Sequence, residues 1–281
     1  MIFSLLTVAF YTASSLGDKF ISAKIGCNER EFSFLVSAST ALFLAIFLPF
    51  LGWKFSFTLQ SCAALCLLVV CKIAEFYTSA MLLKSVSAYE LKSWLSLNVA
   101  VSFLTDVFRG TERFFIAFVP CAVALAVGIG MTAFGGERKG LLRYVFLSIL
   151  YVASKFAYGF GMNLLRRSTS PVSALILVML GVAFLLLPFL RFREFFKKRG
   201  IVKGALTRIP NAAGLWTEAI AAQQNLLLYS LVQPMQLAIL LVVAIARRER
   251  PKAVKLAGGL LTLAAVTAMT VLIYLNGGDS L

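Results

Sequence analysis

Long apolar runs, separated by short polar and basic segments, recur along the whole chain. A helix needs about 20 apolar residues to cross the hydrocarbon core of a bilayer, and the runs are close to that length. They predict ten membrane-crossing helices, at residues 2–24, 32–52, 58–83, 86–107, 114–134, 142–165, 171–190, 206–229, 231–246 and 253–275. No segment between them is long enough to form a soluble domain. We therefore expect an all-α integral membrane protein with one transmembrane domain.

The composition favours the same fold class. Of the 281 residues, 60% are hydrophobic and 14% are charged, and the mean hydropathy is +0.90. Soluble domains are about 45–50% apolar and about 25% charged, so lipid is the solvent that suits this chain. The net charge of +15 could suggest a nucleic-acid partner, but the basic residues gather between the apolar runs, as in cytoplasmic loops. We expect a multi-pass protein of the plasma or inner membrane, with no nucleic-acid partner.

The basic residues also predict an orientation. The segments Arg191–Arg208 and Arg247–Lys255 fall on one side of the expected bundle, whereas few basic residues, such as Arg109 and Arg113, fall on the other. Loops rich in lysine and arginine stay in the cytoplasm, so the first side is expected to be cytoplasmic. With an even number of crossings, both chain ends would then lie outside.

The second half of the chain repeats features of the first. The motif Tyr11-Thr-Ala-Ser14 resembles Tyr151-Val-Ala-Ser154, and Glu75 aligns with Glu218 when the halves are superimposed. The repeats would be residues 1–137 and 138–281, with five helices each. Because five is odd, the second repeat enters the membrane from the opposite side, which makes the repeat inverted. Inverted repeats are typical of alternating-access transporters.

One segment carries a family resemblance. Residues 234–259 hold Pro234-Met-Gln-Leu-Ala-Ile-Leu-Leu, then Arg247-Arg-Glu249, then Lys255-Leu-Ala-Gly258-Gly259. This order resembles the end of the second repeat in the ten-helix, EamA-like branch of the drug/metabolite transporter superfamily, and the span count extends the resemblance to the whole chain. The first half departs from the pattern, since Leu91 stands where proline is common. The outward chain ends also differ from the inward ends typical of the family.

The resemblance implies a basket of helices around a central cavity, with the fifth and tenth helices at the periphery. Members of the family are mostly exporters or exchangers of amino acids, metabolites, organic cations, nucleotide-sugars or lipid-linked groups. The resemblance therefore implies a transporter without naming its substrate.

Charged residues in the middle of apolar runs are the candidate site. A charge near the bilayer centre costs about 2.5–3.5 kcal/mol on insertion scales. Glu218 lies in mid-run, with Asn211 and Asn225 seven residues to either side, so all three share a helical face. This polar stripe is best explained by a water-filled cavity. The alternative is a structural ion pair between Glu218 and Lys155 or Lys92.

The expected helix at 58–83 repeats this arrangement. Glu75 follows Lys72 by three residues, so the two can form an ion pair within their own helix, and such a pair would still favour an aqueous cavity. Lys155 lies in mid-run between Tyr151 and Tyr158, where it could pair with Glu218 or bind a substrate carboxylate. Trp216 precedes Glu218 by two residues and is a further candidate for the cavity wall.

The leading hypothesis is a secondary active transporter, an exporter or exchanger of a small amphiphilic or zwitterionic metabolite such as an amino acid or organic cation. Transport would be by alternating access and could be proton-coupled through Glu218, because a carboxylate in apolar surroundings can exchange protons. The alternative is a flippase of a lipid or lipid-linked group. A membrane enzyme is not expected, because the chain has no histidine and no acidic cluster.

Other partners follow from the same features. The cysteines are read as free thiols rather than metal ligands, since no histidine can join them, and no cofactor motif is present. The segment Arg191–Lys203 mixes phenylalanines with basic residues, so membrane lipid is an expected partner at this surface. Small residues at Ala122, Ala126 and Gly130 predict close helix packing, either within the chain or in a dimer. The protein would be a monomer or homodimer.

Overall fold

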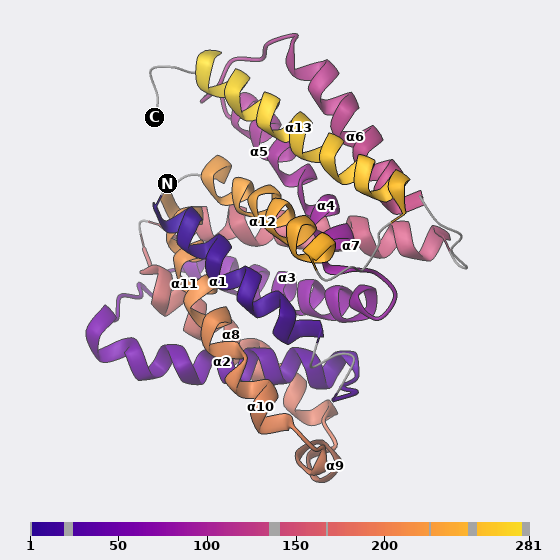
Figure 1. The fold of residues 1–281 in the computed structure, drawn as a ribbon. Coiled ribbons are helices and arrows are strands. Elements are labelled where there is room, and N and C mark those ends of the chain that lie inside the picture. The colour runs from indigo at the N-terminus through magenta and orange to yellow at the C-terminus, as the bar shows by residue number, and fades with distance from the viewer. Residues whose placement is uncertain are drawn as a thin grey trace.

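The computed structural model describes residues 2–19, 25–134, 141–166, 168–224, 226–246 and 252–276. The protein is all-helical, with 86% of its residues in helices and no strands in this part of the chain. The helices, shown in Figure 1, are α1 (Ile2–Lys19), α2 (Glu29–Leu51), α3 (Leu59–Leu83), α4 (Ala88–Leu95), α5 (Leu97–Phe108), α6 (Phe118–Phe134), α7 (Leu141–Leu165), α8 (Pro171–Leu186), the 3₁₀ turn η2 (Leu187–Phe189), α9 (Phe192–Lys197), α10 (Ile201–Leu206), α11 (Arg208–Gln224), α12 (Leu226–Ala246) and α13 (Ala253–Asn276).

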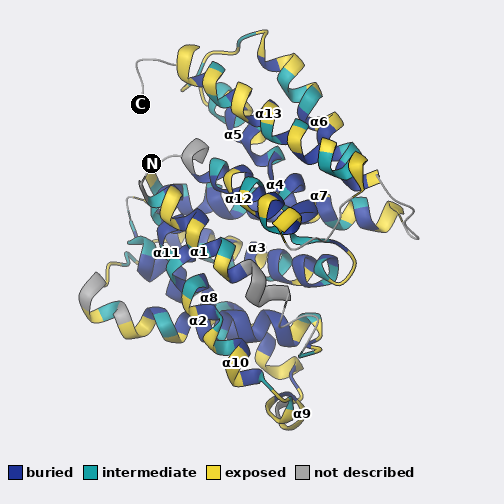
Figure 2. Ribbon diagram, viewed as in Figure 1, coloured by how far each residue is buried: buried dark blue, intermediate teal, exposed yellow. Residues whose placement is uncertain are grey.

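Among the described residues, five helical segments are long and apolar enough to cross a membrane. They are α3, α7, the segment Pro171–Phe189, Tyr229–Ala246 within α12, and α13. Large apolar side chains also cover the outside of the bundle, where Figure 2 shows exposed positions along most helices. Lipid is the surroundings in which such a surface is stable. The expectation of an all-α, membrane-compatible protein is confirmed, whereas the ten crossings and the inverted repeats stay predictions.

Two of the expected ranges do not correspond to single helices. The range 86–107 is divided at Ser96 into α4 and α5, and the range 206–229 covers the whole of α11 and the start of α12. The basic segment after residue 190 forms two short helices, α9 and α10, although its apolar runs are too short to predict them.

Local signals explain where α3 and α8 begin. Thr58 precedes α3, and its hydroxyl oxygen accepts a hydrogen bond from the Ser61 N–H at 3.1 Å. Ser170 precedes α8 and accepts from the Ser173 N–H at 3.3 Å, with Pro171 in the first turn. Side chains of this type satisfy backbone donors that the helix leaves free, and proline fits the first turn because it has no N–H there to satisfy. The Ser61 and Ser168 hydroxyl groups are 3.0 Å apart, so both helices start at the same end of the bundle.

Helices from the first half of the chain pack on helices from the second half. The main pairs are α1 with α11, α2 with α8, α3 with α7, α4 and α5 with α12, and α6 with α13. The last pair lies at one edge of the bundle in Figure 1. There Gly128 and Gly258 face each other so closely that a Cβ atom on Gly128 would lie 2.9 Å from the Gly258 carbonyl oxygen. Ala126, one of the small residues predicted to pack within the chain or in a dimer, is exposed on the single chain.

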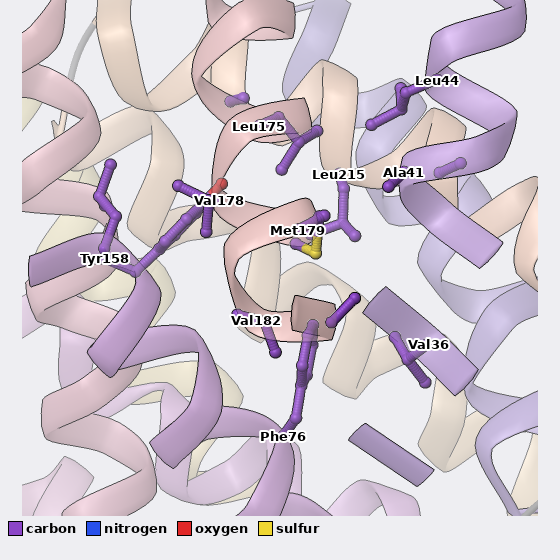
Figure 3. Packing of buried hydrophobic residues seen from close by; sticks show 14 of the residues in the cluster. Val36, Ala41, Leu44, Phe76, Tyr158, Leu175, Val178, Met179, Val182 and Leu215 are labelled. Atoms are coloured by element: carbon purple, nitrogen blue, oxygen red, sulfur yellow. The ribbon is translucent and has the colours of Figure 1, made fainter. Parts of the chain in front are cut away.

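The largest apolar core surrounds α8. Figure 3 shows Leu175, Val178, Met179 and Val182 of this helix packed among side chains of α2, α3, α7 and α11. A second core joins α4, α5, α6, α7 and α13. Between these packed regions lie the charged side chains of α3, α7 and α11.

Candidate functional site

Lys155 lies between the two carboxylates that the repeat aligned. Its ammonium nitrogen is 3.1 Å from Glu75 Oε1 and 2.8 Å from Glu218 Oε1. The three residues come from α7, α3 and α11, and all three are buried. An ammonium group shared by two carboxylates offsets both negative charges, which a buried site requires. Residues separated by 143 positions in the sequence therefore meet at one cation.

Lys72 completes this charged cluster from the other side of Glu75. Its ammonium nitrogen is 2.7 Å from Glu75 Oε2 and 3.7 Å from the centre of the Tyr158 ring. A cation over an aromatic face is attracted by the negative centre of the ring. Tyr158 is thus placed under Lys72. The cluster of Lys72, Glu75, Lys155 and Glu218, called here the ion cluster, has equal numbers of positive and negative side chains.

Polar side chains of two other helices hold Glu218 directly. The Tyr11 hydroxyl of α1 donates a hydrogen bond to Glu218 Oε2. Gln233 of α12 donates from Nε2 to Glu218 Oε1 at 3.4 Å, and its Oε1 accepts from Lys92 of α4 at 3.0 Å. Both expected structural partners of Glu218, Lys155 and Lys92, are therefore connected to it, the first directly and the second through Gln233.

Tyr229 fixes the backbone of α7 beside the ion cluster. Its hydroxyl donates to the Lys155 carbonyl oxygen at 2.7 Å. The ring reaches this position because residue 159 is glycine, since a Cβ atom there would lie 2.2 Å from the ring. This hydrogen bond joins α12 to the α7 backbone at the residue whose ammonium group belongs to the ion cluster.

A cavity of about 70 Å³ borders the ion cluster. This volume is several times what one water molecule needs, and its polar walls can bind water. Glu75 and Lys155 contribute to its wall, together with Tyr11, Lys92, Tyr151 and Asn211. Phe32, Leu83 and Ala88, which lie near the ends of α2, α3 and α4, also line it. We call this end of the bundle the mouth end.

The other candidate residues are placed as follows. Asn211 accepts a hydrogen bond from Ser14 at 3.1 Å and donates to Thr40 at 3.3 Å, so it joins α11 to α1 and α2. Tyr151 lines the cavity, whereas Tyr158 is buried behind Lys72. Trp216 is half-buried against the first apolar core and is not among the residues that line the cavity. Asn225 lies outside the described residues.

Sequence reasoning had missed several residues around the ion cluster. Tyr11 was noticed only as part of the repeated motif, and Gln233 lies one residue before the proline that carried the family resemblance. Neither is charged, so neither gave a signal of its own. Arg208, the last residue of the basic segment predicted for the cytoplasmic side, is completely buried and donates to the Ser14 carbonyl oxygen at 3.3 Å.

The end of the bundle opposite the mouth is joined by backbone hydrogen bonds. The Ser56 N–H donates to the Ser168 carbonyl oxygen at 3.1 Å, and the Ser170 N–H donates to the Lys54 carbonyl oxygen at 2.9 Å. Phe55 and Thr169 face each other between these bonds as an antiparallel bridge. Ser61 and Ser168 add a contact between their hydroxyl groups at 3.0 Å. We call this connection between the loop before α3 and the loop before α8 the latch.

Comparison with known proteins bears on the fold alone. No protein-family model and no curated protein sequence matches the chain. One crystal structure of another protein is similar to this chain, with a TM-score of 0.62 and 12% sequence identity. The similarity covers 97% of this chain and 96% of the other chain. The same arrangement of helices therefore occurs in a protein of nearly unrelated sequence.

Proposed function

We propose that the protein is a secondary transporter of a small amphiphilic or zwitterionic metabolite, such as an amino acid or an organic cation. The observation that carries the proposal is the position of Lys155, shared by Glu75 and Glu218 at the wall of a polar cavity. Ionisable residues within membrane segments are costly and mark functional sites, among them substrate and ion pathways. The ion cluster offers one group of each sign to a solute that carries both.

The helix pairs support two repeats of inverted topology, each with five crossings. If α1, α2, α3, α4 with α5, and α6 correspond to α7, α8, α11, α12 and α13, exchanging the halves turns the α1–α11 pair into the α7–α3 pair. The exchange leaves the remaining pairs unchanged, namely α2–α8, α6–α13 and the contacts of α12 with α4 and α5. A two-fold relation between the halves would produce this pattern. The proposal also keeps the resemblance to EamA-like transporters.

The two ends of the bundle suggest an alternating-access cycle. Residues of the mouth end line the cavity, while the latch joins the two halves at the other end. Opening the second side would require the halves to rock apart at the latch and to close around Phe32 and Ala88. The basic segment after α8 follows the helix end nearest the mouth, so the mouth is proposed to face the cytoplasm.

The ion cluster would couple this motion to the solute. A solute ammonium group would compete with Lys155 for Glu75, and a solute carboxylate would compete with the glutamates for Lys155. Protonation of Glu218 would remove one of the two charges that hold Lys155 and free its ammonium group to bind the solute. Because solute and proton act on the same ion pair, each would change the affinity for the other.

Transport in proteoliposomes tests the proposal. A thermal-shift screen over amino acids, quaternary amines, nucleotides and sugars would select the solutes that bind, and these would then be used as radiolabelled substrates. Wild-type protein should accumulate at least one of them when a pH gradient is applied. Glu218→Gln should lose the pH-driven uptake, while Glu194→Gln, a change at an exposed carboxylate, should keep it.

Two outcomes would contradict the proposal in different ways. If no bound solute crossed the membrane in wild-type proteoliposomes, transport itself would be refuted. If Glu218→Gln kept its full pH-driven uptake, Glu218 would be excluded from coupling. A flippase is the alternative function, but a cavity of about 70 Å³ suits a small solute better than an acyl chain.

A further inference from the structure

A basic segment between α8 and α11 is not explained by transport. It comprises η2, α9 and α10, and Figure 1 shows α9 and α10 projecting from one edge of the bundle. We call residues 187–206 the platform. The helices before and after the platform place it at the mouth end, because α8 ends there and α11 begins there.

One face of the platform is fixed to the bundle. Phe195 is buried and packs edge-on against Phe34 of α2, with ring centres 5.8 Å apart. Lys198 donates to the Gly26 carbonyl oxygen at 2.9 Å and forms an ion pair with Glu31 of α2. Ile201 and Gly204 of α10 are also buried. These contacts fix the orientation of the platform on the bundle.

The rest of the platform surface combines exposed apolar and basic side chains. Phe196 is 62% exposed and Val202 is 69% exposed, and Phe189 and Leu206 are exposed as well. The exposed basic residues of the platform are Arg191, Arg193, Lys197, Arg199 and Lys203. Its acidic residue, Glu194, lies 3.6 Å from Arg191. A surface with apolar residues between cations is suited to the boundary between acyl chains and headgroups.

We propose that the platform binds anionic phospholipid, with its basic side chains on the headgroup phosphates and its exposed apolar side chains among the upper acyl carbons. The charge of the surface selects anionic over zwitterionic headgroups. The interleaved apolar side chains favour a lipid over free phosphate, because an ion would leave Phe196 and Val202 exposed to water. This inference requires only that the protein lies in a bilayer, so it is independent of the proposed transport.

The platform is also connected to the mouth of the cavity. Its Lys198 holds Glu31, and the next residue, Phe32, lines the cavity. Glu31 also caps α2, since its side chain accepts from the Asn28 N–H at 2.8 Å. A lipid bound to the platform would therefore stabilise the first turn of α2 at the rim of the mouth.

Lipid binding to the full-length protein tests the proposal. Native mass spectrometry of detergent-solubilised protein would measure the occupancy of added phosphatidylglycerol and, separately, of phosphatidylcholine. The variant Arg193→Gln/Lys197→Gln/Arg199→Gln should lower the affinity for phosphatidylglycerol by roughly tenfold or more. Its affinity for phosphatidylcholine should stay unchanged. The charge-conserving variant Arg193→Lys/Lys197→Arg/Arg199→Lys should retain the wild-type affinity.

A matched control removes three exposed charges at the other end of the bundle, in Lys54→Gln/Arg113→Gln/Arg166→Gln. This variant should bind phosphatidylglycerol as the wild type does. Equal losses in both triple variants would show attraction by net charge alone and would overturn the proposal. Wild-type affinity in the platform variant would also overturn it. Full displacement of the lipid by millimolar inorganic phosphate would identify a free-phosphate site instead.

Discussion

Glu75 and Glu218 hold the same ammonium group, that of Lys155, at 3.1 Å and 2.8 Å. The carboxylates come from α3 and α11, which belong to opposite halves of the chain. Each glutamate also has a further partner, Lys72 for Glu75 and Tyr11 for Glu218. The shared cation is thus a buried point at which the two halves are electrostatically coupled, and separating them there would leave a buried charge without compensation.

Replacing Lys155 alone should destabilise the protein more than replacing Lys155 and Glu218 together. Lys155→Met would leave two carboxylates facing each other in a buried site, which should cost about 3–5 kcal/mol of unfolding free energy. In Lys155→Met/Glu218→Gln one of the carboxylates becomes neutral, so much of this loss should be recovered. Chemical or thermal unfolding in detergent measures both variants. A double variant as unstable as Lys155→Met would contradict the role of charge compensation.

The contact between α6 and α13 should tolerate no added side chain at Gly128. A Cβ atom there would lie 2.7 Å from Thr262 Oγ1 and 2.8 Å from the Thr262 backbone nitrogen, so the helices would have to move apart. Gly128→Ala should therefore lower the unfolding free energy by about 1–3 kcal/mol. Gly130→Ala is the control, because its Cβ would meet only Phe134, at 3.8 Å. Equal stability of the two variants would show that the helices do not pack as described.

Much of the fold could be predicted from the sequence because hydrophobic length is a local property. The all-α class and the starts of α3 and α8 follow from apolar runs and from caps at Thr58 and Ser170. The break at Ser96 could not be predicted, since no proline or glycine marks it and the residues on either side remain helical.

The candidate site was predictable only where a charge interrupts an apolar run. Glu75, Lys155 and Glu218 were identified because a charge in lipid requires a partner. The contact of both carboxylates with Lys155 depends on how α3, α7 and α11 pack against one another. No single apolar run determines that packing. Tyr11 and Gln233 are neutral residues whose importance comes entirely from their neighbour Glu218. The burial of Arg208 could not be predicted, because a buried arginine at the end of a basic loop has the same sequence pattern as an exposed one.

The Cys27 thiol should react slowly with maleimides. Cys27 precedes α2, outside the membrane-compatible segments, and its burial raises the pKa of the thiol to about 11, with Glu31 adding to this effect and Lys198 opposing it. Because the thiolate is the reactive form, labelling at pH 7.5 should be at least about tenfold slower than at an exposed cysteine. The measurement uses a variant in which the other four cysteines are serine, with Arg199→Cys in a Cys27→Ser background as the exposed reference.

At pH values where exposed thiols are already ionised, the labelling rate of Cys27 should still rise with pH. Lys198→Gln removes the cation that opposes the shift, so the pKa of Cys27 should rise further and labelling should become slower still. Faster labelling in Lys198→Gln would instead show that the platform had lost its hold on Gly26 and Glu31. Equal rates for Cys27 and the exposed reference would contradict the burial of this thiol.

The latch offers a way to hold the bundle in one state. Phe55 and Thr169 form an antiparallel pair that is flanked by the two backbone hydrogen bonds rather than joined by them. In such a pair the two Cα atoms are about 4.5 Å apart. A disulfide can span this distance. Phe55→Cys/Thr169→Cys should therefore form a disulfide under mild oxidation, detected by a mobility shift or by mass spectrometry. If the halves must part at the latch, oxidation should stop solute exchange in proteoliposomes and reduction should restore it. The single variants Phe55→Cys and Thr169→Cys should respond to neither treatment, and undiminished exchange by the cross-linked protein would mean that the latch does not open during transport.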